Sequence, residues 1–328
     1  MTHTALAREI INGNPISLRE ASALISTSDE DTFNLLAAAN LLRKTYKGNK
    51  IKLCAIVNAK SGRCSEDCSF CAQSAHHQTG SATYPLLNQE EMVNAAKTAE
   101  TTMSATCFSI VTSGKSTKTD SELETIGSAL MAINHETNLN RCVSIGTLTK
   151  EAILKLKNSG LERVHHNLEA AESYFSRICT THTYAERLQT IKLAKQAGLE
   201  VCSGGIFGLG ETLEQRVELA FTLRELEVES VPINILNPVK GTPAADNYQP
   251  MSPLGVLRLV ATYRFILPNA DIGVFGGREK ALGELQPLMF IAGANVTLVG
   301  DYLTTKGQAP DKDLKMIADL GLEIDHQC

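Results

Sequence analysis

The chain has 328 residues, of which 43% are hydrophobic and 20% charged, and its net charge is −5. This size allows one large core, while the mildly acidic balance and scattered basic residues argue against nucleic acid or anionic membrane as partners. No segment approaches the roughly 18 apolar residues of a membrane span, and the N-terminus lacks the order typical of a signal peptide, so we expect a soluble, cytoplasmic protein.

The first 46 residues are predicted to be a helical extension, because Ser17 and Glu20 form a capping box ahead of an Ala- and Leu-rich run. Residues 47–328 are predicted to form one domain with a short tail that is polar and peripheral from about residue 308. Within this domain, short β-rich runs alternate with helical segments. The expected buried parallel strands are residues 52–58, 105–112, 141–147, 163–168, 200–207, 231–236, 271–275 and 295–299.

Helices are predicted between these strands. Those that begin at Thr149 and Thr183 should stop at Gly160 and Gly198, and Thr212–Gln215 is a second capping box. Eight strands and about seven intervening helices indicate the α/β class and a (β/α)8 TIM-type barrel. A doubly wound open sheet is the alternative, but the glycine-rich nucleotide turn that usually follows its first strand is missing.

A cysteine loop stands at that place instead. Cys64, Cys68 and Cys71 form a C-x3-C-x2-C run with Phe70 before the last cysteine. Three thiolates at this spacing can hold three irons of a 4Fe–4S cluster and leave the fourth iron open to a ligand. A zinc knuckle or three ordinary core thiols is the alternative, yet the sequence has no second pair with zinc spacing. The run follows the first strand, where active sites of such barrels form.

Three further cysteines, Cys107, Cys142 and Cys202, fall in the second, third and fifth predicted strands. A single strand cysteine is usually a small buried hydrophobe. Three in separate strands of one barrel, in a chain whose nine cysteines are expected to stay reduced, favour a second metal site.

The loop resembles the signature of radical S-adenosylmethionine (SAM) enzymes. From about Ile51 to Thr305 the chain resembles the biotin synthase family in particular. The resemblance implies that the open iron chelates the amino and carboxylate groups of SAM, with Phe70 beside the adenine. It also implies that Cys107, Cys142 and Cys202 hold an auxiliary 2Fe–2S cluster.

In that family the fourth ligand of the auxiliary cluster is an arginine on the seventh strand. This chain has Gly273 there, and Arg278 belongs to a flanking stretch that matches separately. We hypothesise that Cys54, in the first strand, replaces the arginine. Four thiolates suit a 2Fe–2S cluster and a four-iron cluster equally, and the alternative is that Cys54 only packs in the core.

The resemblance also assigns residues to SAM and to the substrate. Asn167 and Glu169 match an Asn-x-Asp element that contacts the SAM ribose and the substrate, and Arg187 matches the partner of the SAM carboxylate. Asn234 matches the residue that, with Asn167, hydrogen-bonds the ureido ring of dethiobiotin. Without the resemblance, Arg187 would be read as a solvated helix residue and Asn234 as a strand cap. The pair His165–His166 is expected to pack or to hydrogen-bond, with at most one ring facing inward.

By this resemblance the chain converts dethiobiotin to biotin, with electrons from a flavodoxin or ferredoxin, as a homodimer. The cofactors carry the chemistry, so no side chain is predicted to be catalytic. The alternatives are another radical SAM enzyme of the hydrogenase-maturation type and a non-catalytic iron–sulfur electron carrier or sensor. Cys179 and Cys328 fit no predicted site.

Overall fold

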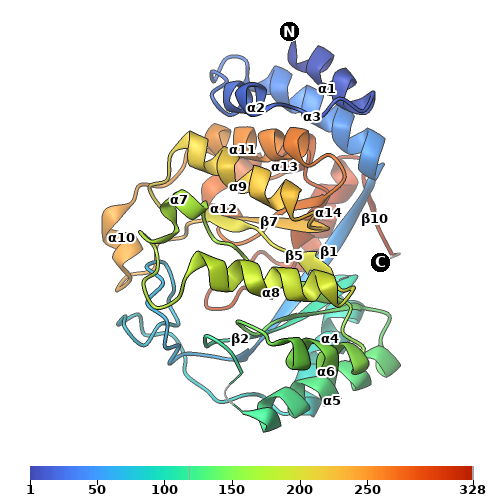
Figure 1. The fold of residues 1–328 in the computed structure, drawn as a ribbon. Coiled ribbons are helices and arrows are strands. Elements are labelled where there is room, and N and C mark those ends of the chain that lie inside the picture. The colour runs from blue at the N-terminus through green and yellow to red at the C-terminus, as the bar shows by residue number, and fades with distance from the viewer. Residues whose placement is uncertain (118, 327–328) are drawn as a thin grey trace.

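The computed structural model describes residues 1–117 and 119–326, and its centre is a closed ring of parallel strands (Figure 1). The strands are β1 (Lys50–Lys60), β2 (Cys107–Thr112), β3 (Asn140–Ser144), β4 (Arg163–His165), β5 (Glu200–Cys202), β6 (Gly205–Phe207), β7 (Ser230–Ile235), β8 (Asp271–Val274) and β9 (Val296–Leu298). Strand β1 pairs with β2 on one side and with β9 on the other, which closes the ring. The predicted (β/α)8 barrel is therefore confirmed, and the open doubly wound sheet is wrong.

The predicted fifth strand is divided into β5 and β6. Between them, Gly204 lies so close to β7 that a Cβ atom added there would be 2.0 Å from the carbonyl oxygen of Pro232. Pro232 has no N–H to give to the ladder. The pairing with β7 therefore stops after Cys202 and resumes at Gly205.

Helices surround the barrel, and the three whose starts were predicted begin directly after Thr149, Thr183 and Thr212. The longer ones are α4 (Gln89–Met103), α5 (Asp120–Glu136), α6 (Lys150–Asn158), α8 (Tyr184–Gln196), α9 (Leu213–Glu225) and α11 (Pro253–Ile266). The short ones are α7 (Glu172–Phe175), α10 (Pro243–Asn247), α12 (Arg278–Leu282), a 3-10 turn (Gly283–Leu285) and α13 (Leu288–Ile291). Both predicted capping boxes are present, Ser17–Glu20 and Thr212–Gln215. Gly160 and Gly198, with φ of +92° and +69°, follow α6 and α8 as predicted.

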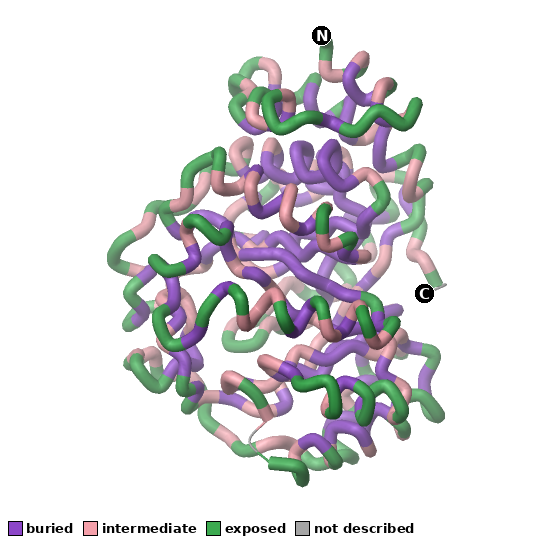
Figure 2. The backbone as a smooth tube through the Cα atoms, in the orientation of Figure 1, coloured by how far each residue is buried: buried purple, intermediate pink, exposed green. Residues whose placement is uncertain are grey.

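Three helices precede the barrel: α1 (His3–Ile11), α2 (Leu18–Ile25) and α3 (Thr32–Lys47). They lie together at one end of the molecule, where α3 packs against α1 and α11 (Figure 1). Figure 2 shows that buried residues follow the strands and that the outward parts of the surrounding helices are exposed. No described helix is long and apolar enough to cross a membrane. The predicted division at residues 46 and 47 stays a prediction.

The C-terminal segment differs from its expectation as a peripheral tail. It forms α14 (Pro310–Asp319) and a short strand β10 (Glu323–Ile324), which pairs with the start of β1. The side chain of Asp313 is fully buried, and its Oδ1 lies 2.8 Å from Nη2 of Arg278. The expectation was wrong because a buried ion pair, which the polar composition does not reveal, fixes α14 to the barrel. Cys328 lies outside the described residues.

Candidate active site

A cavity of about 400 Å³ opens at the carboxyl ends of the barrel strands. Its wall includes ten side chains that the sequence singled out or that lie beside them, namely Cys64, Cys68, Phe70, Cys71, His165, His166, Asn167, Glu169, Arg187 and Asn234. They come from the loop after β1, from the end of β4 and the loop that follows it, from the end of β7 and from α8. The barrel thus brings together residues that are far apart in the sequence, as the βα-loop rule predicts.

The loop after β1 is folded onto itself by its own backbone. The amide of Cys64 donates to the carbonyl oxygen of Gln73, and the amide of Cys71 donates to that of Cys68. All three thiols of the loop border the cavity, and burial raises the pKa of Cys71 to about 11. A metal would deprotonate such thiols on binding. Three cysteines that border one cavity fit a cluster with one iron left for a ligand.

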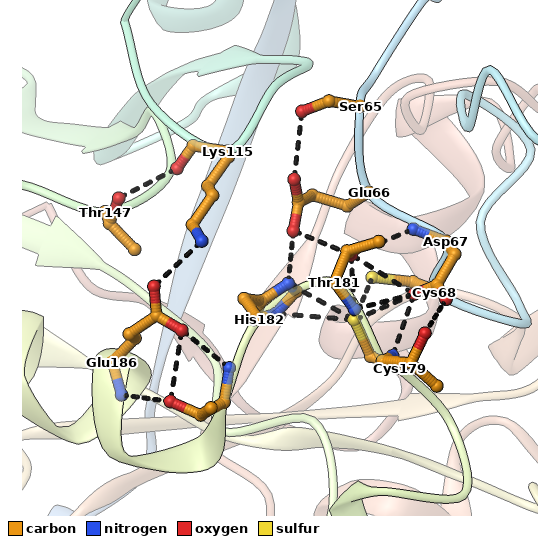
Figure 3. A network of polar contacts seen from close by, with 12 residues as sticks. Ser65, Glu66, Asp67, Cys68, Lys115, Thr147, Cys179, Thr181, His182 and Glu186 are labelled. Atoms are coloured by element: carbon orange, nitrogen blue, oxygen red, sulfur yellow. Dashed lines mark hydrogen bonds and ion pairs between the residues drawn. The ribbon is translucent and has the colours of Figure 1, made fainter.

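A fourth thiol, which the sequence analysis assigned to no site, lies beside this loop. The Sγ of Cys179 is 3.7 Å from Sγ of Cys68, 3.2 Å from Nδ1 of His182 and 3.2 Å from Oδ1 of Asp67 (Figure 3). The ligand atoms of Cys68, Cys179 and His182 lie within 4.8 Å of one another. The spacing Cys179-x2-His182 was the available signal. Unlike Cys68, Cys179 does not border the cavity.

Asn167 and Glu169 lie next to each other, although β4 ends before them. The Nδ2 of Asn167 is 3.4 Å from Oε2 of Glu169, and the Oδ1 of Asn167 accepts a hydrogen bond of 3.1 Å from the amide of Gly204. Glu169 is in the left-handed region, with φ of +69°. The two side chains therefore meet through a turn and not through strand alternation. Burial raises the pKa of Glu169.

His165 and His166 both border the cavity. Strand alternation predicted that at most one of the two rings would face the inside of the barrel. The reason is that β4 ends at His165, so alternation does not extend to His166. His165 contacts Oδ1 of Asn167 at 3.0 Å through Nε2. The Nε2 of His166 is buried without a hydrogen-bond partner among the described residues, and burial lowers the pKa of the ring. A neutral ring with a free nitrogen at the wall fits a site built to hold a polar ligand.

Arg187 is held in place by residues of two other segments. Its Nε donates to Nε2 of His182 at 3.0 Å, and its Nη1 donates to the carbonyl oxygen of Asn167 at 2.8 Å. The other ring nitrogen of His182, Nδ1, lies 2.5 Å from Oε2 of Glu66, which belongs to the cysteine loop. A series of hydrogen bonds, Glu66–His182–Arg187, therefore connects the cysteine loop to the arginine that is predicted to bind the carboxylate of SAM. Arg187 is not a solvated helix residue.

Asn234 also borders the cavity, at the end of β7. Its Oδ1 accepts from the amide of Gly276 at 3.0 Å, and its Nδ2 donates to the carbonyl oxygen of Gly205 at 3.3 Å. These contacts are those of a strand cap. Because an amide group has a second lone pair and a second N–H, they leave Asn234 able to bind a ligand as well.

Deeper in the barrel, four cysteines come from four strands: Cys54, Cys107, Cys142 and Cys202, on β1, β2, β3 and β5. Cys54 is paired directly with Cys107 across the ladder. Contact with Cys54 and the charge of Arg163 lower the pKa of Cys107 to about 7, while burial raises that of Cys202 to about 11. The structure thus brings Cys54 to the three cysteines expected to hold the auxiliary cluster.

The side chain of Arg163 lies beside these cysteines, and the sequence analysis did not predict a role for it. Its side chain is buried, its Nη1 lies 3.8 Å from Sγ of Cys107, and its Nη2 and Nε contact Oε2 of Glu200 at 2.5 and 2.9 Å. The available signal was an arginine inside a buried strand next to the strands of Cys142 and Cys202. At Gly273, an added Cβ would lie 2.5 Å from the carbonyl oxygen of Val296. There is no room at Gly273 for an arginine.

Comparisons with known proteins identify the family of the chain. Residues 59–223 match the Radical SAM superfamily, and residues 232–323 match the Biotin and Thiamin Synthesis associated domain. The biotin synthase of Geobacter sulfurreducens is 48% identical over 324 residues, which cover 99% of this chain and 98% of that protein. That of Trichlorobacter lovleyi is 50% identical over 319 residues, covering 97% and 95%. The chain belongs to the biotin synthase family.

Membership of the biotin synthase family makes the chain a radical SAM enzyme, with a 4Fe–4S cluster and SAM as its cofactors. Solved structures are similar in fold. Methylornithine synthase has a TM-score of 0.85 at 19% identity, covering 98% of this chain and 97% of that one. The FeFe-hydrogenase maturase of Carboxydothermus hydrogenoformans has 0.81 at 19%, covering 98% and 78%. At these identities the similarity shows the fold alone, and the biotin synthases are the much closer relatives in sequence.

Proposed function

We propose that this chain converts dethiobiotin to biotin by inserting one sulfur atom between a methyl and a methylene carbon. The observation that carries the proposal is one cavity that joins Cys64, Cys68 and Cys71 to the polar groups of Asn167 and Asn234, in a chain about half identical to biotin synthases along nearly its whole length.

Each polar group of the cavity has a place in this proposal. Cys64, Cys68 and Cys71 hold the 4Fe–4S cluster, and Phe70, which is half-buried at the wall, lies beside the SAM adenine. Bound there, the cluster and SAM supply the radical chemistry that unactivated C–H bonds require.

Three side chains then orient the bound molecules. Arg187 pairs with the SAM carboxylate, because its Nη2 is left for a ligand when Nε and Nη1 are engaged. Asn167 and Glu169 accept from the ribose hydroxyls, and Asn167 with Asn234 hydrogen-bonds the cyclic urea of dethiobiotin. Their fixed positions set the distance between SAM and substrate.

The auxiliary cluster is proposed to be held by Cys107, Cys142 and Cys202, with Cys54 as fourth ligand. Its position as the ladder partner of Cys107 supports this role, and four thiolates suit two or four irons. Iron and sulfide should be counted in anaerobically reconstituted wild type and Cys54→Ser. A lower count in the variant is expected, and unchanged stoichiometry would end the Cys54 hypothesis.

The function is tested by an anaerobic assay with SAM, dithionite and dethiobiotin. Biotin formation in wild type, and none in Cys64→Ala, is the expected result. Deoxyadenosine without biotin would indicate a different radical SAM enzyme, and no SAM turnover would indicate an electron carrier or sensor.

Partners and location are proposed on the same basis. A flavodoxin or ferredoxin supplies the electrons, and the chain acts as a homodimer in the cytoplasm. The cysteines of the described residues are free thiols, which suits a compartment that keeps thiols reduced.

A further inference from the structure

Cys179 has no part in the proposed reaction, yet the fold fixes it opposite Cys68. The contacts that do so are made by the chain neighbours of both residues. The amide of Ser69 donates to the carbonyl oxygen of Ile178 at 2.8 Å, and the amide of Thr180 donates to Oδ1 of Asp67 at 2.9 Å. We call these two hydrogen bonds clamps. The first joins the residue after Cys68 to the residue before Cys179, and the second joins the residue before Cys68 to the residue after Cys179.

These clamps need no metal, because they consist of backbone groups and one carboxylate. Asp67 also accepts hydrogen bonds from the hydroxyl groups of Thr180 and Thr181, which fixes the segment further (Figure 3). The sulfur atoms of Cys68 and Cys179 are therefore held 3.7 Å apart by the two segments themselves. To form a disulfide, the two sulfur atoms must come together from this distance to a bond of roughly 2 Å.

We propose that Cys68 and Cys179 form a reversible disulfide when the loop carries no cluster and meets peroxide. Cys68 borders the cavity, so peroxide that enters the cavity meets this thiol directly. Transfer of one oxygen atom to its sulfur gives a sulfenic acid and one water. The sulfur of Cys179 then displaces the hydroxyl group, which leaves as a second water, so that two thiols have given two electrons to one peroxide.

The disulfide has a consequence for the loop. A sulfenic acid that finds no thiol can be oxidised further to sulfinic acid, which is irreversible in most proteins. Capture by Cys179 stops that step and keeps Cys68 recoverable by a thiol reductant. While the disulfide lasts, Cys68 is withheld from iron. This last consequence rests on the proposed role of Cys68 in the cluster, whereas the disulfide itself depends only on the thiols.

The test uses the full chain, freed of iron by a chelator without oxygen and then treated with one equivalent of hydrogen peroxide. After alkylation and trypsin digestion without reductant, Cys179 lies on the peptide of residues 178–187, and the three loop thiols lie together on residues 64–97. A cross-linked pair of these two peptides is the expected product. It should persist in Cys64→Ala, Cys71→Ala and the control Cys54→Ser, and vanish in Cys68→Ala and Cys179→Ser.

A disulfide inside the peptide of residues 64–97, or no cross-link while Cys68 is oxidised, would overturn the proposal. Recovery is a second measurement. A sulfinic acid consumes two peroxides per thiol, so this measurement uses peroxide in excess. After that treatment and then dithiothreitol, wild type should take up as much iron as untreated protein, while Cys179→Ser should take up less and carry sulfinic acid at Cys68. Circular dichroism before oxidation checks that the variant is folded. Because iron-free protein is used, failure here leaves the anaerobic biotin assay unaffected.

Discussion

The guanidinium group of Arg163 lies against the thiol of Cys107, with Nη1 3.8 Å from Sγ, and its charge also acts on the other three cysteines of the barrel. An arginine is always charged, so it offsets the negative charge that thiolates would gather there. The ion pair with Glu200 holds the guanidinium in this direction. A cluster bound by these cysteines would feel a fixed positive charge from β4.

Replacing Arg163 with Met should therefore make the reduction potential of the auxiliary cluster more negative, because a nearby positive charge favours the reduced state. We also expect the iron-free variant to lose about 1–3 kcal/mol of unfolding free energy. Potentiometric titration followed by absorption spectroscopy measures the first effect and urea unfolding the second. Arg163→Lys, which keeps the charge, should retain most of the potential, and an unchanged potential in Arg163→Met would refute the charge argument.

Gly273 should not tolerate any side chain. Its added Cβ would lie 2.5 Å from the backbone oxygen of Val296, and backbone in a barrel strand cannot move away cheaply. Gly273→Ala should lower the unfolding free energy by about 1–3 kcal/mol, measured by urea unfolding. Gly255→Ala, where the nearest atom is the side-chain oxygen of Ser252, is the control and should cost less. Equal unfolding free energies of the two variants would show that the backbone of β8 can move to accommodate a side chain, which would contradict this prediction.

The barrel could be predicted from the sequence, since runs of β-branched residues and helix caps mark each element locally. The polar residues of the cavity could be predicted only through the resemblance to the biotin synthase family. What could not be predicted are contacts between segments. Cys179 can be interpreted only through its contact with Cys68, which is more than a hundred residues away. Arg163 can be interpreted only through the cysteines on four other strands. The split of the fifth strand likewise depends on Pro232, in the neighbouring strand. The spacing of residues along the sequence does not reveal such contacts between distant segments.

The hydrogen-bonded chain Glu66–His182–Arg187 predicts that two further residues of the cavity wall, to which no SAM contact is assigned, control SAM binding. Without the Nε2 acceptor of His182, 3.0 Å from Nε of Arg187, the guanidinium should lose its fixed direction. In His182→Asn and in Glu66→Gln we expect SAM to bind about tenfold more weakly, a loss of about 1.4 kcal/mol, with little change in kcat at saturating SAM. The Kd is measured by the change that SAM causes in the EPR spectrum of the reduced cluster.

Lys155→Gln, which breaks an exposed ion pair with Glu124, is the matched control and should leave SAM affinity unchanged. A fall in kcat without a change in the Kd for SAM would assign His182 to another role.

The buried pair of Arg278 and Asp313 predicts that α14 is a structural part of the barrel. Removing the carboxylate leaves a buried guanidinium without its partner, so Asp313→Ala should lose about 3–5 kcal/mol of unfolding free energy. Asp319→Ala, which breaks an exposed pair with Lys315 in the same helix, should change it by less than about 1 kcal/mol. Urea unfolding of both variants measures the difference, and similar losses would contradict a special role for the buried pair.

Asp271, at the start of β8, predicts how stability depends on pH. Burial alone would raise the pKa of its carboxyl, but Lys47 and Lys52, each with Nζ 2.9 Å away, hold that pKa well below its ordinary value. A carboxyl with a lowered pKa in the folded chain stabilises it fully above its unfolded pKa of about 4 and loses this contribution as the pH falls further. Asp271→Asn should therefore cost about 3 kcal/mol at pH 7 and progressively less below pH 4. Urea unfolding of the iron-free proteins at several pH values tests this, and a difference that stays constant down to about pH 3 would show that the charge of Asp271 does not join α3 and β1 to β8.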